Sequence, residues 1–137
     1  MFLIIDTSDK LYLALSKNSQ IIDEYSGKIR RQSEKLLLSL DKLLKKNKVK
    51  LKDIKAIFVM IGPDSYTGLR VGVAVANSLA YGLEIPIVGI RSRPEKYGAG
   101  AGIKNIINKG EKLLKKAKPG DYIKPVYSQP PRISRKS

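Results

Sequence analysis

Two short segments hold the residue types that could bind a phosphate group. Asp6, Thr7 and Ser8 follow a short apolar run, and an aspartate at a strand end with hydroxyls beside it could hold a metal-bound phosphate. The second segment, residues 62–68, lies between a predicted strand and a predicted helix, where phosphate-binding loops occur. Five residues separate its two glycines and no Lys-Ser/Thr pair follows, so the segment is not a P-loop.

Each segment also has a purely structural interpretation. Asp6 and its neighbours could form an Asx turn. The glycines of 62–68 could serve a turn, with Ser65 or Thr67 capping the next helix. Acid–base or metal chemistry has few candidate groups, because the chain has 12 acids and no histidine; the carboxylates that could approach in space are Asp9, Asp23 and Asp64. We therefore predict no catalytic residue, no metal ligand and no cofactor.

The composition excludes several other classes of protein. At 137 residues the chain has room for one domain and little more, and 42% of its residues are apolar. Cysteine, histidine and tryptophan are absent, which excludes a disulfide framework, a Cys/His zinc site, a catalytic thiol and a Ser-His-Asp triad. The chain has no run of about 18 apolar residues and starts without a basic leader, so we expect neither a membrane span nor a signal peptide.

The net charge of +15 comes from two parts of the chain. Residues 28–55 hold eleven basic and three acidic residues, and residues 91–137 hold thirteen and three, while the remainder is slightly acidic. Such a field favours nucleic acid or an acidic protein as a partner. Lysine spread over ordinary solvated faces would give the same excess. Both interpretations stay open at this point.

Apolar periodicity divides the chain into seven elements and a weaker C-terminal region. The predicted order is β-β-β-α-β-α-β, with strands at 2–5, 11–15, 20–25, 55–61 and 85–90 and helices at 32–47 and 69–81. Gly82 is predicted to cap the second helix. Beyond a glycine-rich stretch we expect a short helix over 103–118, broken at Gly110, and then an extended tail.

The two main helices differ in their apolar surfaces. The first has one wide apolar stripe, formed by Leu36, Leu37, Leu40, Leu43 and Leu44. Leu38 lies off that stripe. The second has small residues at every fourth position, which either let another helix approach closely or pack on the sheet: Gly68, Gly72, Ala76 and Ala80. Because residues 69–81 are apolar or small nearly all round, we expect a partner chain to cover the side that the sheet leaves open.

Four motifs resemble those of a known family. They are I-I-D-T-S at 4–8, R-Q-S-E-K-L-L at 31–37, G-P-D-S-Y-T-G-L-R-V-G at 62–72 and I-P-I-V-G-I at 85–90. Together they resemble the bacterial TsaB (YeaZ) family, in the TsaD-like branch of the ASKHA superfamily, over residues 1–91. The resemblance implies an α/β fold, namely a single ASKHA (ribonuclease H-like) lobe with a mixed sheet, followed by a reduced C-terminal segment at 92–137.

The resemblance implies a function without catalysis by this chain. TsaB-like proteins are scaffold subunits, or pseudoenzymes, that partner TsaD in making N6-threonylcarbamoyladenosine in tRNA (t6A37). TsaD transfers the threonylcarbamoyl group, and the ATPase TsaE joins the complex. We therefore expect a cytoplasmic chain that pairs with TsaD, or with a second copy of itself through the same helices. The basic C-terminal tail could in addition contact tRNA.

The family's pairing surface maps onto both helices of this lobe. The first helix offers Ser33, Leu36, Leu37, Leu40 and Leu44. The second offers Thr67, Arg70, Val71, Ala74, Asn77, Ser78 and Tyr81. Asp6, Thr7 and Ser8 correspond to a vestigial phosphate loop, and the resemblance assigns them no catalytic role.

The chain departs from the family in its second lobe. Only 46 residues follow Arg91, and a closing segment at 125–130 resembles the family's P-x-Y-x-R-x motif, with Gln129 in place of arginine. The second lobe therefore resembles a remnant. Two other functions stay open: a small catalytic ASKHA-type phosphotransferase, and a freestanding basic RNA-binding protein.

Overall fold

The computed structural model describes residues 1–8, 10–28, 33–62, 69–91 and 101–124. Along them lie β1 (Phe2–Asp6), β2 (Leu11–Lys17), β3 (Gln20–Gly27), α1 (Ser33–Lys46), the 3-10 helix η1 (Leu51–Asp53), β4 (Ala56–Gly62), α2 (Leu69–Leu83), β5 (Ile87–Arg91) and α3 (Ala101–Leu114). The predicted order β-β-β-α-β-α-β is confirmed, and its boundaries agree to within two residues.

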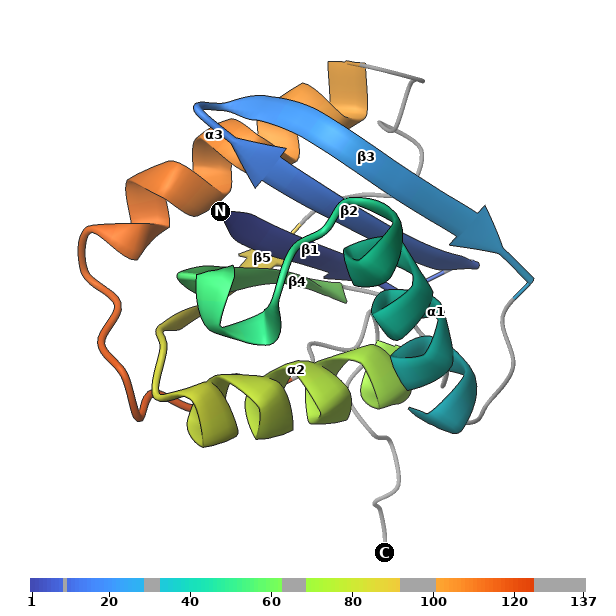
Figure 1. Cartoon of the computed structure of the whole chain (residues 1–137). Coiled ribbons are helices and arrows are strands. Elements are labelled where there is room, and N and C mark those ends of the chain that lie inside the picture. The colour runs from blue at the N-terminus through green and yellow to red at the C-terminus, as the bar shows by residue number, and fades with distance from the viewer. Residues whose placement is uncertain (9, 29–32, 63–68, 92–100, 125–137) are drawn as a thin grey trace, which may run out of the picture.

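The strands form one mixed sheet in the order β3-β2-β1-β4-β5 (Figure 1). β1, β2 and β3 make an antiparallel meander, and β4 and β5 run parallel to β1. In register, Phe2 lies between Ser16 of β2 and Ala56 of β4. The starts of β1 and β4 and the end of β2 therefore meet at one end of the sheet.

Burial along each strand follows its place in the sheet. β4 is buried over its whole length, and its sequence AIFVMIG is apolar throughout, as expected for a parallel strand covered on both faces. β3 lies at an edge and alternates between exposed and partly buried residues, the period-two pattern of a strand with one covered face. The mixed α/β fold and single lobe that we predicted are thus confirmed.

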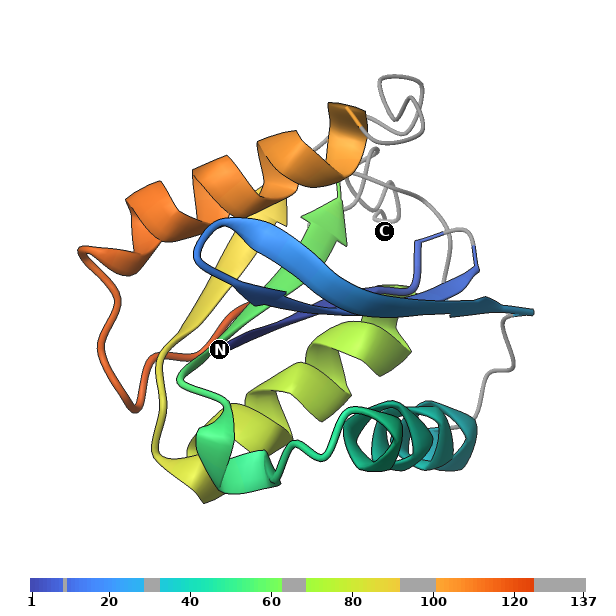
Figure 2. The same ribbon diagram turned by 45° about the horizontal axis from the view of Figure 1, so that its top comes forward.

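Helices cover both faces of the sheet (Figure 2). α1 and α2 lie on one face, where the buried residues of the larger core include Leu36, Leu40 and Leu44 from α1 and Ala76 and Ala80 from α2. α3 lies on the opposite face, where Ile106 and Ile107 join a second core around Phe58. The small residues of α2 therefore bring that helix close to the sheet, as the second of our two interpretations predicted.

Both α1 and α2 end in residues with left-handed backbone conformation. At α1, Lys48 has φ 56°, and Val49 N donates to the Leu44 carbonyl at 2.9 Å. At α2, Glu84 has φ 56°, and Ile85 N donates to the Ala80 carbonyl at 3.0 Å. These are Schellman ends with a non-glycine residue at the left-handed position. The prediction that Gly82 caps α2 is therefore wrong, because the helix continues past it to Leu83.

α3 is continuous, so the predicted break at Gly110 is wrong. Gly110 is buried, and a Cβ atom built on it would lie 2.4 Å from Cδ2 of Phe58. The missing side chain therefore lets α3 rest directly on the Phe58 ring. The division into 1–91 and 92–137 stays a prediction, since the helix of the second range packs on the sheet of the first.

Candidate partner interface

Asp6, Thr7 and Ser8 form a hydrogen-bonded turn where β1 ends. Asp6 Oδ1 accepts hydrogen bonds from the Ser8 backbone N–H at 2.8 Å and from the Ser8 hydroxyl at 2.6 Å. The hydroxyl oxygen of buried Thr7 accepts the backbone N–H of Gly72 in α2 at 3.2 Å. A Cβ atom on Gly72 would lie 2.5 Å from that oxygen. The Asx-turn interpretation is confirmed, and the turn ties β1 to the first turn of α2.

The glycine-rich loop is only partly described. Gly62 ends β4 opposite Arg91, after a shift in register, and has φ 105°, a conformation that favours glycine; its predicted role in a turn stays a prediction. Residues 63–68, which include the predicted caps Ser65 and Thr67, lie outside the described residues. Within the part of the chain that the structure describes, no three His, Cys, Asp or Glu side chains gather as a metal site would require. A role of this region as a vestigial phosphate loop stays a prediction.

The interface residues predicted on α1 divide into two groups. Leu36, Leu40 and Leu44 are buried to 5% exposure or less in the chain's own core, because α1 turns its apolar stripe toward the sheet. Leu37 is 44% exposed and is free to contact a partner. Ser33 begins α1, and its side chain lies outside the described part of the structure.

Four of the interface residues predicted on α2 lie on its outer side. Arg70, Ala74, Ser78 and Tyr81 are exposed, and their spacing of three or four residues places them on one face of the helix. Tyr81 is 81% exposed, although tyrosine usually buries much of its ring. Val71 is only partly exposed and packs against the core. The described residues therefore leave the outer face of α2 uncovered.

Asn77 has a structural role that the sequence did not reveal. It is 9% exposed, and its side-chain amide donates to the Ile123 carbonyl at 2.7 Å and accepts the Ile123 backbone N–H at 3.0 Å. Two hydrogen bonds thus fasten the segment after α3 to α2. The contact joins residues 46 positions apart, so no local pattern could have indicated it. Asn77 is not available to a partner in this arrangement.

α1 and α2 cover the same face of the sheet, so their outer sides form one surface (Figures 1 and 2). We call it the pairing face and define it by Leu37, Arg70, Ala74, Ser78 and Tyr81. The sequence missed one further candidate on α1, Leu38, which is 60% exposed. Its position off the apolar stripe was the signal that could have identified it. Contact of this face with a partner stays a prediction.

No helix within the described ranges is long and apolar enough to cross a membrane.

Comparisons with known proteins agree with the family that the motifs indicated. A family model described as TsaD, tRNA N6-adenosine threonylcarbamoyltransferase, matches residues 13–93. The tRNA threonylcarbamoyladenosine biosynthesis protein TsaB of Bacillus subtilis is 37% identical over 92 residues, which are 66% of this chain and 40% of that protein. TsaB of Escherichia coli is 30% identical over 89 residues, covering 64% of this chain and 38% of that protein.

A solved structure gives the same result at the level of the fold. YeaZ from Pseudomonas aeruginosa superposes with a TM-score of 0.59 and 28% identity, covering 66% of this chain and 43% of that one. The chain thus spans about two fifths of the length of the relatives that it matches. Because the family model matches more than half of the chain, the chain belongs to the TsaD-like family and resembles its TsaB (YeaZ) members.

Proposed function

We propose that this chain is a non-catalytic scaffold subunit in the biosynthesis of N6-threonylcarbamoyladenosine in tRNA. It pairs with a TsaD-type subunit through the pairing face and takes part in a complex that also contains TsaE. The names of the TsaB relatives support the pathway, and we carry it to this chain as part of the proposal. This function would place the chain in the cytoplasm.

The observation that carries the proposal is the uncovered outer face of α2. Ala74 and Ser78 are small and exposed, so a partner helix could approach the backbone closely between Arg70 and Tyr81. Leu37 adds an exposed apolar side chain from α1 on the same side of the sheet. Tyrosine and arginine, which flank these small residues, are both enriched in protein interfaces. A second copy of this chain could use the same face, as a competing occupant.

The chemistry of the chain supports a role without catalysis. The sequence contains no histidine and no cysteine, so it lacks the imidazole and thiol groups that most often act as general base, nucleophile or zinc ligand. The hydroxyl of Thr7 accepts the Gly72 amide, and the Asp6 carboxylate accepts two hydrogen bonds from Ser8. These groups hold the β1–α2 junction together, which is a structural task.

The proposal can be tested by reconstituting the modification. An unmodified tRNA transcript is incubated with threonine, bicarbonate, ATP, the donor-forming enzyme, and the TsaD-type and TsaE-type proteins of the same source. We expect t6A to form at least about tenfold more slowly without this chain, and we expect the chain alone to hydrolyse no ATP. Equal t6A formation with and without the chain would contradict the scaffold role. ATP turnover by the isolated chain would favour the phosphotransferase alternative.

A further inference from the structure

Positive groups from separate parts of the chain meet at the end of the sheet where β1 begins. The first is the α-amino group of Met1. Lys55 lies beside it, because its backbone N–H donates to the Met1 carbonyl at 2.8 Å. Lys17 follows Ser16, the partner of Phe2 in the antiparallel register, and therefore lies on the other side of Met1. Lys17, Met1 and Lys55 therefore lie side by side at one end of the three central strands β2, β1 and β4.

Two further elements extend this row. The Lys55 ammonium donates to the carbonyl of Lys52 in η1, at 3.5 Å, which brings both lysines to the same end. On the other face of the sheet, the Ser19 hydroxyl donates to the Glu111 carboxylate at 2.8 Å and so ties the last turns of α3 to the β2–β3 turn. The chain leaving α3 then crosses this end of the sheet on its way to α2 (Figures 1 and 2).

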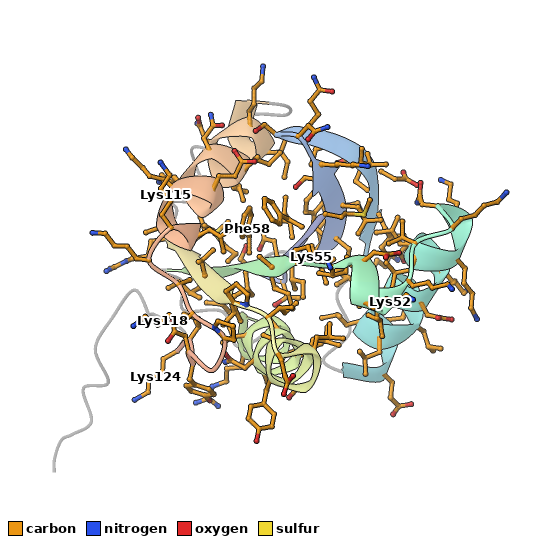
Figure 3. All side chains as sticks on the ribbon, turned by 60° about the vertical axis from the view of Figure 1, so that its left-hand side comes forward. Lys52, Lys55, Phe58, Lys115, Lys118 and Lys124 are labelled. Carbon is orange, nitrogen blue, oxygen red and sulfur yellow. The ribbon has the colours of Figure 1, made fainter. Side chains whose placement is uncertain are left out.

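Lysines follow that crossing segment. Figure 3 shows Lys115, Lys118 and Lys124 spaced along it, with Lys55 and Lys52 on the neighbouring part of the same view. We call this surface the basic end and define it by six exposed lysines: Lys17, Lys52, Lys55, Lys115, Lys118 and Lys124. It combines Lys17 of β2 with Lys52 and Lys55 from the first basic run of the sequence and three lysines from the second.

Two acids, Asp53 and Asp121, lie close to the basic end and offset part of its charge without pairing with its lysines. None of its six lysines has a carboxylate within ion-pair distance in the described part of the chain, whereas Lys45 and Lys46 of α1 pair with Asp41 and Asp23. The acids Asp53 and Asp121 instead accept backbone N–H groups. Burial, and then repulsion by Lys17 and Lys55, lowers the pKa of the Met1 α-amino group, while the Asp53 carboxylate acts in the opposite direction.

We propose that the basic end binds the phosphate backbone of RNA. Six flexible ammonium groups spread over an open surface suit a polyanion with regularly spaced charges, because each phosphate contact releases a condensed counterion. The choice of RNA over an acidic protein rests on the proposed function in tRNA modification. The location does not, since the sheet register and the path of the chain after α3 define the basic end. Its Lys124 adjoins α2, because the preceding Ile123 is hydrogen-bonded to Asn77.

Salt dependence of binding to an unmodified tRNA transcript tests this proposal. Fluorescence anisotropy is measured between about 50 and 200 mM salt with the whole chain. With about five phosphate contacts, the slope of log K against log salt is about −3.5 to −4.5, so the affinity falls roughly 100- to 500-fold over this range. The triple variant Lys52→Gln, Lys55→Gln, Lys118→Gln loses about three contacts, and its affinity falls only about tenfold over the same range.

A matched triple variant controls for net charge. Lys10→Gln, Lys28→Gln, Lys35→Gln removes the same charge from exposed lysines away from the basic end. We expect its salt slope to stay within about one unit of the wild type. Equal loss in both triples would overturn the proposal in favour of non-specific attraction by the +15 chain.

A second probe separates RNA from an acidic protein partner. Polyglutamate is titrated in competition with the tRNA transcript. We expect tRNA to bind the wild type at least about tenfold more tightly than polyglutamate of equal charge. Tighter binding of polyglutamate, lost in the basic-end triple, would overturn the proposal in favour of an acidic protein. Both triples should still pair with the TsaD-type protein, so failure of RNA binding and failure of the scaffold role can be told apart.

Discussion

The substitution Gly110→Ala tests how α3 is held on the sheet. The new Cβ would lie 2.4, 2.5 and 2.7 Å from three atoms of the Phe58 ring. That ring is fully buried, and its centroid lies 5.0 Å from that of the tilted Phe2 ring. Because the ring cannot move aside, α3 must shift outward, and overpacking of this kind costs about 2–3 kcal/mol. Alanine in a helix recovers about 1 kcal/mol relative to glycine. We expect a net loss of about 1–2 kcal/mol.

Urea unfolding of Gly110→Ala measures this loss, and Gly82→Ala is its matched control. Gly82 also lies inside a helix, but a Cβ atom there would meet nothing within 4 Å. Gly82→Ala should therefore raise the free energy of unfolding by up to about 1 kcal/mol. Combining Gly110→Ala with Phe58→Leu should recover part of the loss, a coupling of about 1 kcal/mol. If Gly110→Ala is as stable as Gly82→Ala, α3 does not rest on Phe58 and the reasoning is refuted.

Three further predictions concern contacts between elements. Asn77→Ala should cost about 1–3 kcal/mol and speed hydrogen exchange at the Ile123 amide, because two hydrogen bonds are lost; unchanged exchange would argue against this contact. Glu84→Gly should stabilise by about 1 kcal/mol in urea unfolding, since glycine adopts a φ of 56° without strain; a loss would contradict the Schellman end. The Asn47 amide, the Glu24 backbone N–H and Lys46 lower the pKa of Asp23 below its usual 3.8. The ionised Asp23 carboxylate therefore stabilises the fold fully at pH values well above 3.8, and this stabilisation is lost as the pH falls through the lowered pKa. On acidification, the midpoint of urea unfolding should fall less in Asp23→Asn than in the wild type. Equal decreases in the two proteins would count against this contribution.

The sequence predicted the order of elements because strand and helix periods differ clearly here. β4 is a continuous apolar run and α1 has one apolar stripe, so neither could be mistaken for the other. The ends of helices were harder. Gly82 was predicted to cap α2, but the tertiary path of the chain places the left-handed turn at Glu84. In the same way, Gly110 was taken for a helix break, although its small size serves a contact with Phe58, 52 residues earlier.

The candidate site was only partly predictable for a related reason. A periodic stripe of leucines identifies a buried face without saying whether the protein's own sheet or a partner buries it. For Leu36, Leu40 and Leu44 the sheet does so. Residues 69–81 were expected to leave apolar surface for a partner, but the chain's own core buries Val73, Val75 and Ala76. The exposed side of α2 instead carries Arg70, Ala74, Ser78 and Tyr81. The basic end could not be predicted, because its lysines come from segments that meet only through the sheet register and the path of the chain after α3.

Binding of a TsaD-type subunit to the pairing face can be measured on the purified complex. The chain is co-expressed with the TsaD-type protein of the same source and analysed by size-exclusion chromatography with light scattering. We expect a 1:1 complex for the wild type and for the control Asn105→Arg, whose arginine is added to the exposed side of α3. Ala74→Arg should remain folded but weaken pairing at least about 100-fold, because an arginine buried without a partner costs about 3 kcal/mol or more. A 1:1 complex that survives Ala74→Arg, or a homodimer that ignores the TsaD-type protein, would contradict this expectation.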